Sequence, residues 1–243
     1  MLAIFRKEIN SFFSSLIGYL VIGVFLLVMG LFLFVFPDTS LLTFGYASLG
    51  PFFTLAPNVL TFIIPAVTMR AFAEERQTGA IELLVTRPLT DWQIVLGKFL
   101  ACLVLVLIAL LPTLLYYYTI YQLGDPVGNI DGGGTAGSYL GLTFLGMAFV
   151  AIGLFASSLT SNQIVAFLLA LALSFWMYFG FSLLASLPAF YLNGETLVES
   201  LGMQAHFHSL GRGLIDTRDV IYFLSLTAFF LLGTVISLER RKW

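Results

Sequence analysis

Residues 132–194 read GGGTAGSYLG LTFLGMAFVA IGLFASSLTS NQIVAFLLAL ALSFWMYFGF SLLASLPAFY LNG and contain no charged side chain. A membrane-spanning helix needs about 20 apolar residues, so this run of 63 residues is too long for a single helix. The polar cluster from Ser157 to Gln163 divides the run into two parts. We therefore expect a hairpin of two membrane spans, near residues 138–156 and 164–184.

The rest of the chain has the same character. Of its 243 residues, 59% are hydrophobic and 10% are charged, and its mean hydropathy is +0.99. Soluble domains carry about 25% charged residues, so lipid must be the solvent for most of this chain. Other uncharged runs predict four more spans, near residues 16–36, 50–69, 99–121 and 220–238.

The sequence thus predicts an all-α polytopic membrane protein that forms a single domain with six transmembrane helices. A large soluble bundle would need charged helix faces, and a β-barrel would need segments of about 10 residues with alternating polarity. The sequence has neither pattern.

The distribution of Lys and Arg predicts the orientation, because cytoplasmic loops carry an excess of both. With six spans, the N-terminus, the loop 70–98, the turn 157–163 and the C-terminus share one side. That side holds nine of the eleven basic residues, namely Arg6, Lys7, Arg70, Arg76, Arg87, Lys98, Arg240, Arg241 and Lys242. The opposite loops hold seven acidic residues and only two basic ones. We expect both termini to be cytoplasmic.

Residues 2–14 place apolar and polar side chains on opposite faces of a helix. Such a segment is typical of a helix that lies along the membrane surface before the first span. The alternative is a plain extension of that span. A cleaved signal peptide is not expected, because the apolar core of 21 residues exceeds the roughly 7–15 of a signal sequence.

Signatures of catalysis and of cofactor binding are missing. Gly97-Lys98 is followed by Phe99 where a P-loop requires Ser or Thr, so we expect no ATP site on this chain. We expect no catalytic or metal site, since His206 and His208 are two residues apart and do not face one way on a helix. A net charge of −2 gives no reason to expect nucleic acid as a partner. The spans also lack the ionisable residues typical of ion-coupled carriers, so any energy source must lie outside the chain.

The loop 70–98 is the most informative polar segment. Ile81 and Leu84 share one face of a predicted short helix that Pro88 must end, and Thr90 or Asp91 can cap the next helix. A short helix with both charged and apolar surface suits docking to a soluble partner. It also suits a simple connector at the membrane surface, and the residues alone leave both interpretations open.

This segment resembles the first cytoplasmic loop of ABC-2-type transporter permeases. The resemblance lies in Glu74-Glu75-Arg76-Gln77-Thr78-Gly79-Ala80-Ile81-Glu82-Leu83-Leu84, Pro88-Leu89 and Gly97-Lys98. Within that family the chain is most similar to the gliding-motility-associated, GldF-type permeases of Bacteroidota. That similarity lies in Phe5-Arg6-Lys7-Glu8-Ile9-Asn10-Ser11-Phe12-Phe13, Gly18-Tyr19-Leu20-Val21-Ile22-Gly23, His206-Phe207 and Arg212-Gly213-Leu214-Ile215-Asp216.

The resemblance implies a type V exporter-like permease fold in the bacterial inner membrane. A coupling helix would insert into a separate ABC ATPase, which would bind the ATP and Mg, while this chain would bind no cofactor. The residues implied in coupling are Glu75, Arg76, Gly79, Ile81, Glu82, Leu84, Arg87 and Pro88. A second contact would use Thr160, Asn162 and Gln163, and short outer helices in a re-entrant segment 185–219 would carry His206, Arg212 and Asp216.

Further partners that the resemblance implies are a second permease copy or a related chain, the lipid bilayer and an accessory gliding-motility subunit. Two other functions remain open at this stage. One is a membrane scaffold or signalling subunit without a transport path, and the other is an independent channel or carrier. The residues of the spans do not identify a substrate.

Glycines and prolines within the spans predict features of packing. Gly141, Gly146 and Gly153 are expected to allow close helix approach in the fourth span. The prolines expected to kink their helices are Pro57, Pro65 and Pro112.

Overall fold

The computed structural model describes residues 1–43, 45–79, 90–187 and 195–240. This part of the chain is almost entirely helical and contains no β-strand. Six helical segments are long and apolar enough to cross a membrane, namely Leu16–Val35, Gly50–Gln77, Asp91–Leu123, Gly132–Leu159, Gln163–Ala185 and Thr217–Glu239. The predicted fold class, an all-helical protein with six candidate spans, is confirmed.

Several of these spans are composed of more than one helix. An N-terminal helix, α1 (Leu2–Ser14), precedes them. Span one is α2 (Leu16–Gly30) followed by a π-helical turn, Leu31–Val35. Span two is α3 (Gly50–Thr68) followed by α4 (Arg70–Gln77). Span three is α6 (Asp91–Leu110), a 3-10 turn, Leu111–Thr113, and α7 (Leu114–Leu123). Spans four and five are α8 (Gly132–Leu159) and α9 (Gln163–Phe175) with a π-helical turn Trp176–Gly180 and α10 (Phe181–Ala185). Next come α11 (Glu195–Glu199), α12 (Met203–Leu210) and the sixth span, α13 (Thr217–Glu239).

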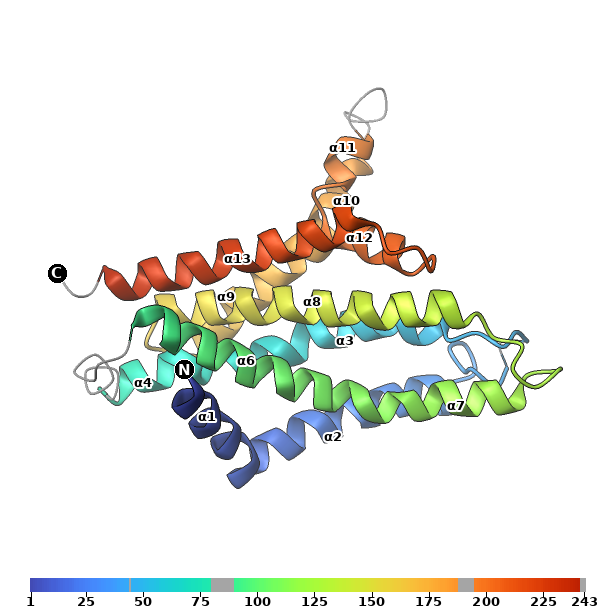
Figure 1. Ribbon diagram of the computed structural model, residues 1–243, viewed down its shortest axis with the longest axis horizontal. Helices are drawn as coiled ribbons and strands as arrows, with labels where there is room; N and C mark the ends of the chain where they lie inside the picture. The colour runs from blue at the N-terminus through green and yellow to red at the C-terminus, as the bar shows by residue number, and fades with distance from the viewer. Residues whose placement is uncertain (44, 80–89, 188–194, 241–243) are drawn as a thin grey trace.

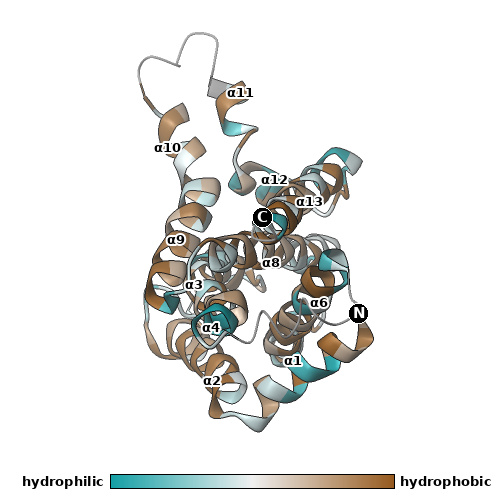
Figure 2. Cartoon of the chain, turned by 90° about the vertical axis from the view of Figure 1, so that its left-hand side faces the viewer, coloured by the Kyte–Doolittle hydropathy of each residue, from teal (hydrophilic) through white to brown (hydrophobic). Residues whose placement is uncertain are grey.

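The helix α8 lies at the centre of the bundle and packs against α3, α6, α9 and α13 (Figure 1). We compare the spans by the buried share of their most apolar part. This share is 72% in span four, against 28% in span one and 28% in span five. Figure 2 shows hydrophobic residues on the outward faces of α2 and α9, and hydrophilic residues on α4. The outer spans therefore present apolar surface outward, as lipid contact requires.

Glycines of α8 lie where neighbouring helices approach it most closely. A Cβ on Gly141 would lie 3.0 Å from the Phe207 ring, and a Cβ on Gly146 would lie 3.1 Å from Val106. A Cβ on Gly153 would overlap the side chain of Thr68 on α3. The predicted role of these three glycines in close helix approach is confirmed.

The prolines expected to disturb helices lie at irregular points of the bundle. Pro57 and Pro65 are inside α3, and Pro112 lies in the 3-10 turn between α6 and α7. Span two bends at Met69, one turn after Pro65, and continues as α4 to Gln77. The helix therefore continues past the predicted limit at residue 69, because α4 adds eight mostly polar residues, about two turns, beyond the apolar part.

The helix α1 is separate from the first span and lies across one end of the bundle (Figure 1). Ser15 breaks the helix with an extended backbone, φ −107° and ψ 157°. Inside the bend, a Cβ on Gly18 would lie 2.6 Å from the Phe12 carbonyl oxygen, and α1 crosses α6 where Gly97 faces Ile4. The structure therefore contains a separate N-terminal helix and not a simple extension of span one.

The segment between spans five and six folds back against the bundle. The short helix α12 packs on α8 and α13, while α10 and α11 project away from the other helices (Figure 1). Close packing of α12 depends on Gly137, where a Cβ would overlap the Leu210 carbonyl oxygen. Short helices were predicted in this segment, and its described residues contain two, α11 and α12.

Candidate functional site

The four segments predicted to share one side meet at one end of the bundle. The helix α1 contacts the start of α6 through Glu8 and Lys98. The end of α8 contacts α4 through Ser157, and Ser237 near the end of α13 donates to the carbonyl of Ser158. Residues far apart in the sequence therefore form one continuous polar layer here.

Lys98 is the centre of this layer. Its side chain is 2% exposed, and its Nζ donates to the Glu8 carboxylate at 2.8 Å and to the Ala71 carbonyl at 2.7 Å. A Glu75 oxygen lies 2.9 Å from the same Nζ. The three partners come from α1 and α4, so one ammonium group joins three helices. An ammonium carries three N–H donors; here it makes two hydrogen bonds, to Glu8 and Ala71, and an ion pair with Glu75.

Local sequence explains why Lys98 reaches this position. Thr90 begins α6 with a capping box, in which its side chain accepts from the Gln93 amide while the Gln93 side chain accepts from the Thr90 amide. That cap fixes the start of α6 two turns before Lys98. Gly97 then lets α1 approach closely enough for Glu8 to reach the ammonium.

Glu75 is shared between two cations. Its Oε1 accepts from Lys7 at 2.8 Å as well as lying beside Lys98. Its Oε2 is buried and has no hydrogen-bond partner in the part of the chain that the structure describes. Burial alone would lower the pKa of Lys7, but the hydrogen bond and charge of Glu75, with a smaller contribution from Glu8, outweigh it and raise that pKa. Lys7 therefore stays charged at neutral pH.

The bend between α3 and α4 is held by a residue of α8. Ser157 Oγ accepts from the amides of Phe72 and Ala73, at 3.0 and 3.1 Å, and donates to the Met69 carbonyl at 2.8 Å. No side chain of the adjoining residues caps α4. Ser157 thus satisfies backbone groups at the bend that would otherwise be buried without partners.

The residues predicted to contact an ATPase fall into two groups. Ile81, Glu82, Leu84, Arg87 and Pro88 lie outside the described residues. Glu75, Arg76 and Gly79 are described, and they form the base of the loop.

These three residues have distinct positions. Glu75 points into the bundle and is 8% exposed, so within this chain it is an internal ion-pair partner rather than a free surface contact. Arg76 is half-buried, and its Nε has no partner within the described ranges. Gly79 has φ +72°, a conformation that favours glycine, and it follows directly after the last turn of α4.

The turn between α8 and α9 is exposed next to this layer. Thr160 ends α8, and its Oγ1 accepts from the Asn162 amide at 3.1 Å. Asn162 caps α9 by accepting from the Ile164 amide at 2.9 Å. The side chains predicted as a second contact thus order the turn, with Gln163 half-buried as the first residue of α9.

The residues predicted for the other side of the membrane, His206, Arg212 and Asp216, lie at the opposite end of the bundle. His206 Nδ1 lies 2.6 Å from Asp219, its Nε2 lies 2.8 Å from the Ser200 carbonyl, and its ring stacks on Tyr222. A carbonyl only accepts, so Nε2 is the nitrogen that donates to Ser200. The pair fastens the α11–α12 segment to α13.

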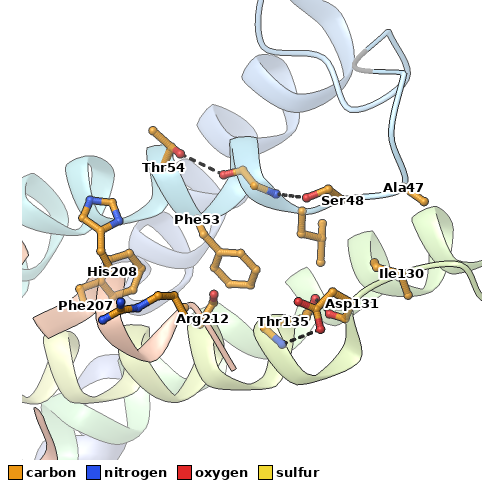
Figure 3. A pocket seen from close by; sticks show the side chains of 15 residues that line it. Ala47, Ser48, Phe53, Thr54, Ile130, Asp131, Thr135, Phe207, His208 and Arg212 are labelled. Atoms are coloured by element: carbon orange, nitrogen blue, oxygen red, sulfur yellow. Dashed lines mark hydrogen bonds between the residues drawn. The ribbon is translucent and has the colours of Figure 1, made fainter. Parts of the chain in front are cut away.

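Arg212 and Asp216 do not join that pair. Asp216 caps α13 by accepting from the Arg218 amide at 2.8 Å. Arg212 donates to Ser209 and, together with His208, lines a cavity of about 310 Å³ between α3, α8 and α12 (Figure 3). In the described ranges, no group of three or more His, Cys, Asp or Glu side chains lies together as metal ligands would.

Sequence reasoning did not identify Glu8, Lys98, Ser157 or Asp219 as members of these clusters. One signal was available for Lys98, which is the last charge before the uncharged run 99–124. Its partner Glu8 likewise precedes the uncharged run that begins at Ile9. Charges at the ends of two neighbouring spans are obliged to lie at similar depth, and opposite signs favour their pairing.

Comparison with known proteins gives two results. A sequence model of a family described as "ABC-2 family transporter protein" matches residues 2–241. Two curated proteins, each named "Probable multidrug ABC transporter permease YbhR", from Escherichia coli K12 and Escherichia coli O157:H7, are 31% identical to this chain over 115 residues. The aligned part is 47% of this chain and 30% of each relative, so the chain matches less than a third of the relatives' length.

Proposed function

The chain belongs to the ABC-2 family of transporter proteins, and from this premise we propose that it is the membrane-spanning permease subunit of an ATP-driven exporter. ABC-2 permeases work with an ABC ATPase partner. In the proposed assembly, ATP and Mg bind to that partner, and this chain converts the partner's movement into a change of its helix bundle. The six candidate spans and the polar layer at one end of the bundle support this function.

One observation carries the proposal. The helix α4 leads directly into the segment 78–90 and is bonded to three other elements of the bundle. It continues span two, accepts from Lys98 of span three through Ala71, and donates to Ser157 of span four. Lys98 also joins it to α1 through Glu8. A displacement of the loop by an ATPase would therefore act on three spans and the N-terminal helix at once.

The segment 74–87 is the proposed coupling helix. Ile81 and Leu84 would supply its apolar anchor, and Glu82 and Arg87 its polar contacts. The described base of the loop supports this role, because the buried ion pairs of Glu75 fix α4 while Gly79 ends it. The exposed turn at Asn162 would form a second contact, since Ser157 ties it to the same helix.

The orientation follows from the basic residues. We place the end that carries α1, α4 and the C-terminus in the cytoplasm, where the ATPase is found, and the α11–α12 segment on the outside of the bacterial inner membrane. A second permease copy or a related chain would complete the translocation path. The sparsely buried faces of spans one and five offer the surface for it.

Within the family, we propose that the exporter serves the gliding-motility machinery, together with an accessory subunit. The similarity in residues 5–13, 18–23 and 206–216 supports this assignment. The relatives from Escherichia coli carry the name of a multidrug permease, so transport assays must include small apolar compounds as well as surface components.

Co-purification tests the ATPase partnership. We would isolate this chain in mild detergent with the ABC ATPase encoded nearest to it, beside a Glu82→Arg, Leu84→Asp double variant. A matched control, Glu199→Arg with Leu201→Asp, places the same changes on the exposed outer segment. We expect wild type and control to retain the ATPase and the loop variant to lose it, with about tenfold weaker retention from the loss of a buried anchor. Retention of the ATPase by all three proteins would refute the coupling role of the loop, and retention by none would refute the partnership.

A further inference from the structure

A cleft of about 220 Å³ lies between α1 and α4, and the buried Lys98 of α6 is part of its lining. Six charged side chains line it, three basic and three acidic, namely Lys7, Arg70, Lys98, Glu8, Glu74 and Glu75. Their charges balance. A balanced cleft discriminates against a simple anion or cation and suits a ligand that carries one charge of each sign.

The acidic part of the cleft has an unused acceptor. Both cations that bind Glu75 approach its Oε1, while Oε2 is buried without a partner in the described chain. Glu75 is 8% exposed, and it lines the cleft. A buried carboxylate oxygen without a hydrogen bond is costly, and a charged N–H donor would satisfy it best.

The basic part of the cleft has unused donors. The Arg70 guanidinium lies over the Phe12 ring at 5.2 Å and makes no hydrogen bond to any described residue. The Lys7 side chain is 57% exposed beside the cleft. A guanidinium presents its N–H groups in a planar fork that matches a phosphate group.

The depth of the cleft is set by the sequence. Arg70 directly follows the uncharged run 39–69, and Lys98 directly precedes the uncharged run 99–124. Charged side chains therefore give way to lipid-compatible helix at this level. In a bilayer this is the depth of the phospholipid headgroups, which a cleft beside an amphipathic helix would meet.

We propose that the cleft binds the headgroup of a phosphoethanolamine lipid. The lipid ammonium donates to Glu75 Oε2, and its phosphate accepts from Arg70 with Lys7 nearby. The binding would tie α1 to α4 through a lipid as well as through Lys98. This site does not depend on the proposed exporter function, since it is formed by this chain alone.

The chemistry distinguishes this headgroup from the other common ones. A choline headgroup has no N–H to donate to Glu75, and quaternary ammonium groups favour open aromatic faces. The nearest ring, Phe12, is covered by Arg70. A phosphoglycerol headgroup has no cation and would leave Glu75 Oε2 without a charged donor.

Native mass spectrometry of the purified full-length chain, without any ATPase, tests the proposal. The protein would be exchanged into nanodiscs that contain phosphatidylethanolamine, its mono- and dimethyl derivatives, phosphatidylcholine or phosphatidylglycerol. Retained lipid is counted for wild type, for Arg70→Ala, and for Arg6→Ala as a matched control on the exposed part of α1 that does not line the cleft. A parallel sample receives soluble glycerophosphoethanolamine.

We expect retention to fall with each methyl group added and to be about tenfold lower for phosphatidylcholine, as the loss of a charge-assisted hydrogen bond predicts. Arg70→Ala should reduce retention of phosphatidylethanolamine by a similar factor, and Arg6→Ala should not. The methyl series uses wild type alone, so it remains decisive if Arg70→Ala misfolds. Equal retention of the ethanolamine and choline lipids would overturn the proposal, as would complete displacement by the soluble headgroup, which would assign the cleft to a soluble ligand.

Discussion

Each end of the bundle holds a close contact between a basic and an acidic side chain, and the two pairs connect very different lengths of chain. Lys98 meets Glu8 across 90 residues and Ala71 across 27. His206 meets Asp219 across only 13. The first pair joins helices that belong to different parts of the sequence, while the second closes a loop onto the span that follows it.

The two pairs share their local chemistry. Beside Lys98 and beside His206, one oxygen of a carboxylate contacts the basic side chain, and the other oxygen, Glu75 Oε2 or Asp219 Oδ2, is buried without a partner in the described residues. The two pairs therefore differ in how much of the bundle each one connects. A change at Lys98 should affect helices across the bundle, whereas the effect of a change at His206 should stay within the α11–α12 segment.

The largest expected effect is at Lys98. Lys98→Met removes the cation and leaves Glu8 and Glu75 buried without it, which should lower the free energy of unfolding by about 3–5 kcal/mol. The single cysteine, Cys102, is buried one turn along α6 from Lys98, so labelling by a thiol-reactive dye on heating reports opening at this site.

Lys7→Met is the matched control. Its side chain is 57% exposed, so the loss should be at most about 1 kcal/mol. Equal losses in the two variants would remove the distinction between the central and the peripheral cation.

A smaller effect at the same end is expected for Ser157→Ala. The change leaves the amides of Phe72 and Ala73 without their acceptor, at a cost of about 1–3 kcal/mol. Amide hydrogen exchange at the start of α4 should speed up. Ser186→Ala serves as control, because that serine bonds only to a carbonyl of its own helix and is exposed. Unchanged exchange in α4 would mean that the bend does not depend on α8.

The smallest effect is expected at the His206–Asp219 pair. Asp219→Asn keeps a hydrogen-bond acceptor but loses the charge opposite His206, which should cost about 1–2 kcal/mol. Exchange should increase in residues 195–212 and stay unchanged in α4. In the control, Asp216→Asn, the new side chain caps a helix as well as the old one, so stability should change by a few tenths of a kcal/mol. Faster exchange in α4 of the Asp219 variant would contradict the local character of this pair.

Much of the architecture could be predicted because it depends on runs of residues. Uncharged stretches locate the six spans, and the glycines of α8 mark its contacts, since both are properties of neighbouring positions in the chain. The break before span one could be anticipated from the amphipathic pattern of residues 2–14. The extension of span two into α4 could not, because that turn is polar and its position depends on Ser157.

The polar layer could not be predicted in the same way. Glu75 reads as a surface residue because its neighbours in sequence are charged, yet α1 covers it in the structure. Its burial depends on Lys7 and Lys98, which are 68 and 23 residues away. His206 and Asp219 are closer in sequence, but which of the two histidines contacts Asp219 depends on how α12 packs against α13.

The bond between Glu8 and Lys98 also has a consequence for the order in which the protein is assembled. Synthesis begins at the N-terminus, so Glu8 leaves the ribosome 90 residues before the lysine that neutralises it. Until the third span has entered the membrane, Gly97 is not in place for α1 to pack against. Until then α1 stays undocked at the membrane surface. Docking of the first helix is therefore a late event in biogenesis, and a nascent chain stalled before residue 97 should leave a cysteine placed at Glu8 open to labelling that the finished protein prevents.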